Sequence, residues 1–194
     1  MGRRRLPRSF YRRDSRVVAP DLLNKVLVHG ERAARIVEVE AYAGADDPAS
    51  HAYRGETARN RSMFARPGLL YVYFTYGMHW CANAVCGEAG EPSAVLLRAA
   101  APLAGVDAMR TARPAARREV DLCSGPAKLC QALGIDGALD GADLVGAGSG
   151  IWLADDGVPP PARPGRSARI GISAGAAHRW RWYVPGDPNL SRRS

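Results

Sequence analysis

The sequence is poor in lysine and has no long hydrophobic run. Its 194 residues include only two lysines, Lys25 and Lys128, so few amines are available for a Schiff-base mechanism and a lyase step is disfavoured. No apolar stretch is long enough to span a membrane or to form the core of a signal peptide. We therefore expect a cytoplasmic protein of one domain that does not contact a membrane.

Motifs for metal binding and for nucleophilic catalysis are also missing. The four cysteines have C-x4-C and C-x6-C spacings, which differ from common zinc frames, and we expect reduced, buried thiols. No H-E-x-x-H motif is present, and Gly148-Ser149-Gly150 is predicted to be a loop rather than a serine elbow. A metal site would have to combine Glu40, Asp46, Asp47 and His51. The sequence therefore gives little support to a catalytic metal.

Positive charge is what the chain has in excess. The formal net charge is +8 and the pI is about 9.8, which favours a polyanionic partner, although the base composition of a genome could produce the same excess of arginine. Seven arginines fall within the first 20 residues. Residues 1–18 are therefore predicted to be a flexible basic arm, either tracking phosphates or solvated, and residues 19–194 to be the folded domain. We expect association with the nucleoid.

Strand patterns outnumber helix patterns, which favours an α+β domain built on an antiparallel sheet. A short helix is expected over 19–24, a long polar loop over 46–67 and a helix over 106–112. A third helix is expected to start at Ser124 as its N-cap and to end before Gly134. The predicted strands are 26–29, 35–42, 69–75, 79–85, 94–98, 151–153, 168–173 and 182–184.

The strand over 35–42 carries the most informative acid. Its alternation places Val37, Val39 and Ala41 on one face and Glu38, Glu40 and Tyr42 on the other. A carboxylate and a tyrosine therefore share a face, and His51 follows after a short loop. Glu40 is the best candidate for a general base, and Glu38 beside it would raise its pKa. Two harmless acids on a solvated strand face are the alternative.

The aromatic hairpin around Tyr76 and Gly77 is the second candidate feature. Tyr71 and Tyr73 share one face of its first strand, where they could pack in a core or form a stacking slot for a nucleobase. A large aromatic side chain at an exposed turn is unusual without a partner, so Tyr76 could act as a wedge that opens a duplex. At the start of the helix after Ser124, free N–H groups and Lys128 could bind a phosphate, or the helix could simply be capped.

Together these motifs resemble the alkyladenine (3-methyladenine) DNA glycosylase family, the methylpurine glycosylases of base-excision repair. The resemblance covers nearly the whole chain after the basic arm. The segments that carry it are Arg35–Tyr42, Ala49–His51, Thr57–Arg61, Met63-Phe64, Pro67-Gly68, Tyr71–Tyr73, Tyr76–Met78, Cys81, Asn83, Val95–Arg98, Leu122–Leu129 and Arg169–Ile172.

The resemblance assigns roles to individual residues. Glu40 corresponds to the general base that activates water for attack at the sugar C1′ carbon, and Arg98 helps to hold that water with a backbone carbonyl near Ile170. The residues that enclose the flipped base are Tyr42, His51 and Tyr73, and Asn83 disfavours the 2-amino group of guanine. On the DNA-binding side are Tyr76 as the intercalating wedge, Met78 and His79 at the minor groove, and the basic residues Arg59, Arg61 and Lys128.

The resemblance also implies a fold and partners. It predicts a single mixed α+β domain on a curved antiparallel β-sheet, with flanking helices and a protruding β-hairpin. The partner would be double-stranded DNA that contains damaged purines, the protein would be a monomer, and no metal or organic cofactor would be needed. The Arg54-Gly55-Glu56 loop and His79 depart from the family pattern and bear on DNA grip and lesion range.

Three functions remain open at this point. The leading hypothesis is a monofunctional DNA glycosylase, which predicts a free base and an abasic product without covalent trapping by borohydride. A non-catalytic binder of damaged DNA or structured RNA would use the same slot without forming product. An RNA base-processing enzyme would prefer RNA substrates. The sequence does not rank hypoxanthine, 3-methyladenine, 7-methylguanine and ethenoadenine as lesions.

Overall fold

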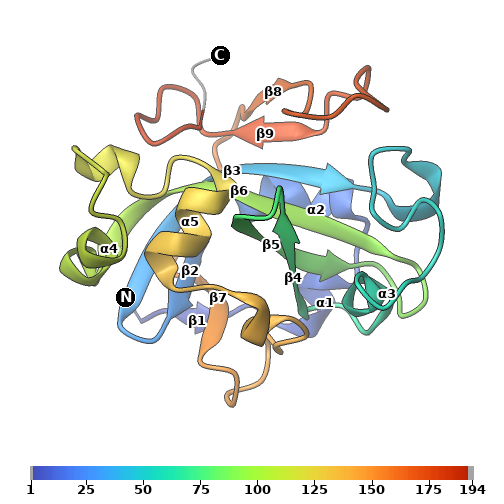
Figure 1. The fold of residues 1–194 in the computed structure, drawn as a ribbon, viewed down its shortest axis with the longest axis horizontal. Coiled ribbons are helices and arrows are strands. Elements are labelled where there is room, and N and C mark those ends of the chain that lie inside the picture. Colours follow the sequence, from blue (N-terminus) through green and yellow to red (C-terminus); the bar gives the residue numbers. More distant parts are fainter. Residues whose placement is uncertain (1, 192–194) are drawn as a thin grey trace.

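A curved antiparallel sheet forms the centre of the structure, a computed structural model that describes residues 2–191 (Figure 1). Within that range the strands are β1 (Arg4–Arg5), β2 (Val26–His29), β3 (Arg32–Tyr42), β4 (Leu70–Thr75), β5 (His79–Cys86), β6 (Ser93–Ala104), β7 (Ile151–Asp155), β8 (Gly165–Ser167) and β9 (Arg181–Tyr183). Their order is β1-β7-β2-β3-β6-β5-β4, and β9 also pairs with β3 and with β8.

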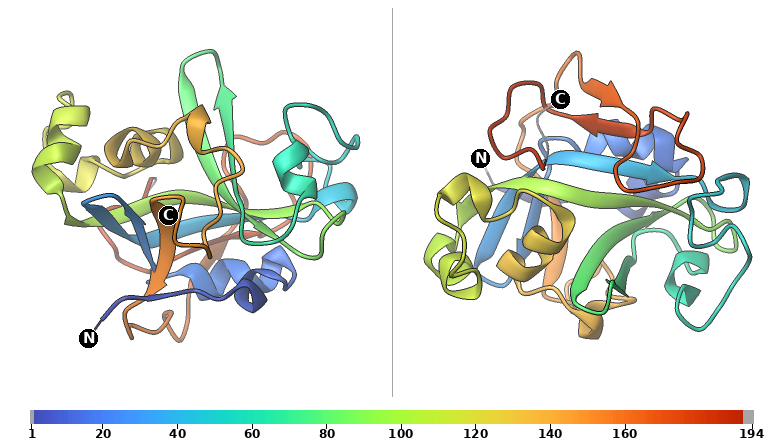
Figure 2. Two further views of the ribbon diagram at one scale, coloured as in Figure 1. Left: turned by 90° about the horizontal axis from the view of Figure 1, so that it is seen from below. Right: turned by 45° about the horizontal axis from the view of Figure 1, so that its top comes forward.

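Helices cover both faces of this sheet. They are α1 (Arg8–Tyr11), α2 (Ser15–Leu22), α3 (Arg61–Phe64), α4 (Val106–Ala112) and α5 (Pro126–Leu133), with 3-10 turns η1 (Gly44–Asp46), η2 (Glu119–Asp121) and η3 (Gly137–Leu139). The left view of Figure 2 shows α1 and α2 on one side, and α4, α5 and the β4–β5 hairpin on the other. The expected fold class, a single mixed α+β domain on a curved antiparallel sheet, is confirmed.

The central strand β3 is buried on both faces, and a bulge changes its alternation. The register against β6 shifts on either side of Glu38, so Ile36 joins Val39 and Ala41 in the main hydrophobic core. The carboxylates of Glu38 and Glu40 are both fully buried and both contact Arg98 of β6. The sheet therefore places the carboxylates of Glu38 and Glu40 on either side of the same guanidinium, that of Arg98.

Residues 2–18 do not form the expected loose arm. Arg4–Arg5 pair with β7, and Leu6, Tyr11 and Val18 are buried in the main core. Arg8 donates two hydrogen bonds to Asp143, and Arg13 donates one to Asp21. The prediction was wrong because apolar residues spaced between the arginines anchor the segment while acids from elsewhere in the chain pair with the charges. Met1 lies outside the described residues.

Other element boundaries also differ from the prediction. The helix expected over 19–24 is α2, which begins at Ser15 because Asp14 accepts a hydrogen bond from Arg16 N, and ends at Leu22. Helix α5 has Gly125, not Ser124, as its N-cap. The strand expected over 168–173 is absent, because β8 ends at Ser167 and the backbone N–H of Ile170 donates to a side chain instead.

The β4–β5 hairpin is confirmed and projects from the sheet (Figure 2, left). Its turn is held by a 3.2 Å hydrogen bond from Met78 N to Thr75 O. Tyr76 and Gly77 both have positive φ, at 52° and 65°, as in a type I′ turn. This conformation suits glycine but is uncommon for tyrosine, so the turn accepts some strain to place Tyr76 at the tip.

The cysteines match their prediction. All four are free and buried, as expected: Cys81, Cys86, Cys123 and Cys130. Burial raises the pKa of the Cys123 thiol to about 12, so this group stays protonated at neutral pH. Over residues 2–191, no helix has both the length and the apolar character that a membrane span requires.

Candidate active site

A cavity of about 540 Å³ opens at the foot of the β4–β5 hairpin. Its walls come from segments far apart in the sequence: the loop after η1, the two hairpin strands, β6, the start of α5 and the segment after β8. The lining residues are Tyr42, Pro48, Ala49, His51, Met63, Tyr71, Tyr73, Thr75, Tyr76, His79, Cys81, Asn83, Leu96, Arg98, Pro126, Ala127 and Ile170–Ala174. We call this space the aromatic cavity.

Glu40 lies directly behind one wall of the aromatic cavity. Its Oε1 accepts a 2.8 Å hydrogen bond from Ile170 N, and its Oε2 accepts a 2.9 Å bond from the Tyr42 hydroxyl. Arg98 Nη1 lies 3.3 Å from Oε2. All three partners line the cavity. A carboxylate has about four acceptor positions, so Glu40 retains capacity for a water molecule.

The surroundings of Glu40 favour a base with raised affinity for a proton. Burial raises the pKa of Glu40, and the charge of Glu38 acts in the same direction, although Arg98 and the hydrogen bonds from Ile170 and Tyr42 oppose it. Burial and the Glu40 charge raise the pKa of Tyr42. Tyr42 therefore remains a phenol and donates to Glu40. The predicted pair of an acid and a tyrosine on one strand face is confirmed.

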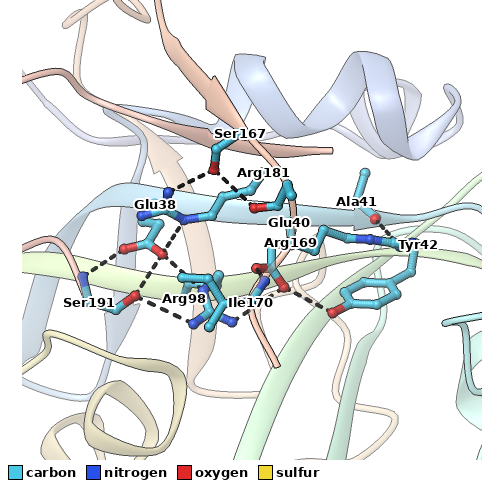
Figure 3. Close-up of polar contacts among 11 residues, drawn as sticks. Glu38, Glu40, Ala41, Tyr42, Arg98, Ser167, Arg169, Ile170, Arg181 and Ser191 are labelled. Atoms are coloured by element: carbon cyan, nitrogen blue, oxygen red, sulfur yellow. Dashed lines mark hydrogen bonds and ion pairs between the residues drawn. The ribbon is translucent and has the colours of Figure 1, made fainter. Parts of the chain in front are cut away.

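The second carboxylate, Glu38, is satisfied by a ring of donors (Figure 3). Its Oε1 accepts from Arg98 Nε at 2.9 Å, from Arg181 Nε at 2.8 Å and from Ser191 Oγ at 2.7 Å. Its Oε2 accepts from Ser191 N at 2.7 Å. Burial opposes ionisation, but Arg181, Ser191 and Arg98 together hold the pKa of Glu38 below its usual range. Glu38 is thus a fixed negative charge beside Glu40.

The predicted base pocket comes together around the aromatic rings. The His51 and Tyr73 centroids are 4.4 Å apart at 75°, and Tyr71 stacks on Tyr73 at 5.4 Å. His51 Nδ1 and the Tyr71 hydroxyl share a 2.9 Å hydrogen bond. Partial burial and the charge of Arg59 lower the pKa of His51. The imidazole is therefore neutral near pH 7.

Asn83 is nearly buried and lines the same cavity. Its Nδ2 donates a 3.1 Å hydrogen bond to Tyr71 O across the hairpin, which fixes the orientation of its side-chain amide. Burial raises the pKa of Tyr73, and the neighbouring Cys81 thiol acts in the same direction. The polar groups of the pocket are therefore held in place by neighbours within the hairpin.

A buried ion pair joins two loops that form the cavity walls. Arg169 donates to Asp47 Oδ1 at 2.7 Å and to Ala41 O at 2.9 Å, and the side chains of Arg169 and Asp47 are fully buried. The guanidinium carbon of Arg169 also lies 4.6 Å from the ring centroid of Tyr42. This pair sets the position of Ile170, which follows Arg169 directly and donates to Glu40.

Two of the predicted DNA-binding residues, Tyr76 and His79, line the mouth of the cavity, and Met78 lies between them in the sequence. Tyr76 is 83% exposed and Met78 is 66% exposed, and His79 lines the opening. Arg59 Nη2 donates a 2.8 Å hydrogen bond to Phe74 O, so it braces the hairpin. An exposed tip with few contacts to its own chain is available to a partner.

Two predicted cationic contacts lie further out. Arg61 is exposed and has Glu56 3.5 Å away. Lys128 donates to Ser124 Oγ at 3.3 Å and lines a second, neighbouring cavity of about 370 Å³ with Arg113 and Gln131. Among residues 2–191 no group of three His, Cys, Asp or Glu side chains has a metal-ligand arrangement, and Asp47 of the considered metal set pairs with Arg169.

Several contacts at the site were not predicted from sequence. Asp47 and Arg169 are 122 positions apart, and Ser191 reaches Glu38 from 153 positions away. Pro126 and Ala127 line the cavity from the start of α5, where only a phosphate contact was considered. The signal for Asp47 was present, because a carboxylate in the Gly-Ala-Asp-Asp-Pro turn close to Glu40 needs a buried partner if it is not solvated.

Comparison with known proteins identifies the family of this chain. The sequence model of the family described as Methylpurine-DNA glycosylase (MPG) matches residues 9–188. A protein of Burkholderia lata named "Putative 3-methyladenine DNA glycosylase" is 58% identical, with 96% of this chain and 90% of the relative covered. Proteins of the same name from Streptomyces avermitilis and Methanocella arvoryzae are 48% and 46% identical, with 96% and 97% of this chain and 90% and 96% of the relatives covered. The chain therefore belongs to the methylpurine-DNA glycosylase family.

Proposed function

We propose that this protein is a monofunctional DNA glycosylase that flips a damaged purine out of duplex DNA and hydrolyses its N-glycosidic bond. The substrates would be alkylated, deaminated or etheno purines, and the product an abasic site. The observation that carries the proposal is a buried carboxylate, Glu40, directly behind an aromatic cavity whose mouth carries the exposed Tyr76. A base in the cavity would bring its sugar to the carboxylate.

Recognition of the base would rest on the rings of Tyr42, His51 and Tyr73. A purine stacks on any aromatic face, and an alkylated purine carries positive charge that the π-face of tyrosine attracts. The neutral His51 adds a polar edge without a competing charge. Asn83, held by Tyr71 O, would disfavour the 2-amino group of guanine.

Cleavage would use Glu40 as general base. The sugar passes through an oxocarbenium-like state, so a carboxylate near C1′ both stabilises the developing charge and takes a proton from the attacking water. Arg98 and the carbonyl of Ile170 would hold that water. Because the ground-state purine is already cationic after alkylation, leaving-group departure needs less assistance than for a neutral etheno or deaminated base.

Hydrolysis without a lyase step is supported by the placement of the lysines. Lys25 pairs with Asp155 at 3.0 Å, and Lys128 donates to Ser124. Neither of them lines the aromatic cavity. A Schiff base at C1′ needs an amine at the reacting carbon, so water activated by Glu40 is the nucleophile that the geometry favours.

Binding to a duplex would rest on the mouth of the cavity. Tyr76 would fill the gap left by the flipped nucleotide, and Met78 and His79 would face the minor groove. Arg59, Arg61 and Lys128 would contact phosphates, consistent with the net charge of +8. A monomer is sufficient for this arrangement, because one chain supplies both the cavity and the wedge.

Single-turnover excision tests the proposal. Labelled duplexes with one hypoxanthine or one ethenoadenine, and methylated DNA, are incubated with the enzyme and then treated with alkali. We expect the enzyme to release the free base and the strand to be cleaved only after the alkali treatment. Borohydride should trap no covalent adduct. Glu40→Gln should lower the rate by at least about a hundredfold while lesion binding persists.

Each other outcome points elsewhere. Tight lesion binding without product from the wild-type protein would identify a damage binder. Faster processing of RNA than of DNA would identify an RNA base-processing enzyme. A Glu40→Gln variant with the wild-type rate would reject the assigned base, and trapping by borohydride would reject monofunctional hydrolysis.

A further inference from the structure

We propose that Glu38 is a positioning residue that holds Arg98 away from Glu40, and that Ser191 clips Glu38 in place. The inference deepens the proposed glycosylase function and rests on it. It assigns a task to a buried acid that does not line the aromatic cavity and to a serine close to the end of the chain.

The bonds of Arg98 are unequal, which is the first observation. Its Nε donates to Glu38 Oε1 at 2.9 Å, whereas its Nη1 lies 3.3 Å from Glu40 Oε2. One guanidinium is therefore shared between two carboxylates and is held more closely by Glu38. With the Glu38 charge removed, Glu40 would be the only one of these two acids left to attract Arg98.

The consequence for Glu40 follows from electrostatics. A closer Arg98 would stabilise the ionised form of Glu40, and loss of the Glu38 charge would remove a repulsion that favours protonation. Both effects make Glu40 a weaker base. Proton abstraction follows Brønsted behaviour, so a weaker base gives a slower step even when the base is fully ionised.

The bonds of Glu38 are the second observation. Glu38 is fully buried, yet it accepts four hydrogen bonds, two of them from Ser191. Ser191 also accepts a 3.4 Å hydrogen bond from Arg98 Nη2. A carboxylate with this many donors on a strand next to a general base is fixed in both charge and orientation.

Ser191 is brought to this point by a turn after β9. Asp187 Oδ1 accepts from both N and Nδ2 of Asn189, each at 2.8 Å, and Asn189 is itself buried. The turn thus returns the chain across Glu38. Arg181, the other cation of the cluster, is tied to Ser167 Oγ at 2.9 Å, so β8, β9 and the terminal segment all brace one carboxylate (Figure 3).

Charged and titratable groups from every neighbouring element act on this pair of acids. Tyr42 belongs to the same strand, Arg98 to β6, Cys81 to β5 and Arg181 to β9, and Arg169 precedes the Ile170 that bonds Glu40. The thiol of Cys81 has its pKa raised by burial and stays neutral. Glu38 is therefore the second negative charge in the group, and its removal should be visible in a pH profile.

The experiment is a pH–rate profile of single-turnover excision for the full chain and its variants. For Glu38→Gln we expect a plateau rate lowered by about tenfold to a hundredfold and an acid limb moved to lower pH. Glu38→Asp keeps the charge, so its acid limb should stay near that of the wild type. Glu31→Gln makes the same change at an exposed turn position and serves as the unchanged control.

Ser191→Ala keeps the inference testable if Glu38→Gln does not fold. It removes the Oγ donor and leaves the backbone N–H, and we expect a rate lowered about threefold with a small shift of the acid limb to lower pH. A lower plateau without any shift of the limb, in both Glu38→Gln and Ser191→Ala, would overturn the inference in favour of a structural role. An unchanged profile would also overturn it.

The failure of this inference differs from the failure of the proposed function. If the wild-type protein releases no base from any lesion, the glycosylase assignment fails before Glu38 is tested. If the wild type is active and Glu40→Gln is not, but Glu38→Gln matches the wild type, only the role of Glu38 is rejected.

Discussion

Two regions of the aromatic cavity differ in how their side chains are held. The rear wall consists of Glu38, Glu40 and the groups that donate hydrogen bonds to them, and the mouth is the hairpin tip around Tyr76. At the rear wall, Glu38 and Glu40 are fully buried, and all four carboxylate oxygens accept hydrogen bonds from the same chain. At the mouth, Tyr76 is 83% exposed on a turn with positive φ. The rear wall is therefore organised before any ligand arrives, whereas the side chain of Tyr76 at the mouth is exposed and can contact a partner.

Under the proposed function the protein performs two tasks, and this difference separates them. Electrostatic stabilisation of a developing charge requires dipoles and charges that do not reorganise during reaction, which the network around Arg98 supplies. Opening a duplex requires contacts that form only with DNA, which an exposed hairpin tip would supply. Substitutions at the rear wall should therefore affect the fold or the chemical step, and substitutions at the mouth should affect binding and its response to salt.

The largest expected effect is on the fold, through the buried pair that braces the rear wall. Asp47→Ala leaves Arg169 buried without its carboxylate, so we expect the free energy of unfolding to fall by about 3–5 kcal/mol. Denaturant unfolding measures this. Glu119→Ala breaks an exposed pair with Arg110 and should change stability by less than about 1 kcal/mol. Equal stability of the two variants would show that the Asp47 pair is dispensable.

The same comparison explains what could be predicted from sequence. The mouth was predicted well: the alternation of the two strands and Gly77 between them located the hairpin and its tip. The hairpin forms between residues that are close in sequence, and local sequence patterns predict such structures well. The rear wall was found in part, because Glu40 and Tyr42 share a strand but Arg169, Arg181 and Ser191 arrive from the far end of the chain.

The misplaced elements have a similar cause. Residues 2–18 were interpreted from their arginines, yet Leu6, Tyr11 and Val18 decide their position in the core. The segment after β8 reads as a strand by composition, but Ile170 N bonds to the Glu40 side chain. In both places a tertiary contact overrides the local pattern, and the second is at the candidate site itself. The roles of the site residues remain predictions.

The next effect in size concerns the wedge. Tyr76→Ala removes the ring that would replace the flipped nucleotide in the stack, so excision from a duplex should slow by about tenfold to a hundredfold at subsaturating enzyme. Tyr76→Phe retains the ring and should keep most of the rate. Single-turnover rates over a range of enzyme concentration give the comparison. If Tyr76→Ala matches the wild type, the hairpin tip does not enter the stack.

A shift in pH dependence is expected from the rear wall of the unaltered protein. In the proposed mechanism activity needs ionised Glu40, and burial raises the pKa of this group above its usual range. The rate should therefore fall as pH decreases through a midpoint above the ordinary glutamate value of about 4.3. A pH–rate profile on a neutral lesion such as ethenoadenine shows this limb. A limb at or below the ordinary value would mean that Glu40 is more solvated than its contacts indicate.

The smallest effect is expected from the charges around the mouth. Arg61 is exposed, and its one described ion pair, with Glu56 at 3.5 Å, is also exposed, so a phosphate could replace Glu56 as its partner. Arg61→Ala should weaken duplex binding a few-fold, on damaged and undamaged DNA alike, and reduce the slope of log affinity against log salt concentration by about one. Arg3→Ala removes the same charge near the N-terminus, which lies on the opposite side of the molecule from the hairpin (Figure 2, left). Equal salt slopes for the two variants would mean that total charge, rather than the position of Arg61 beside the cavity, attracts DNA. Among the residues tested, Tyr76 would then be the one whose position at the mouth matters for DNA binding.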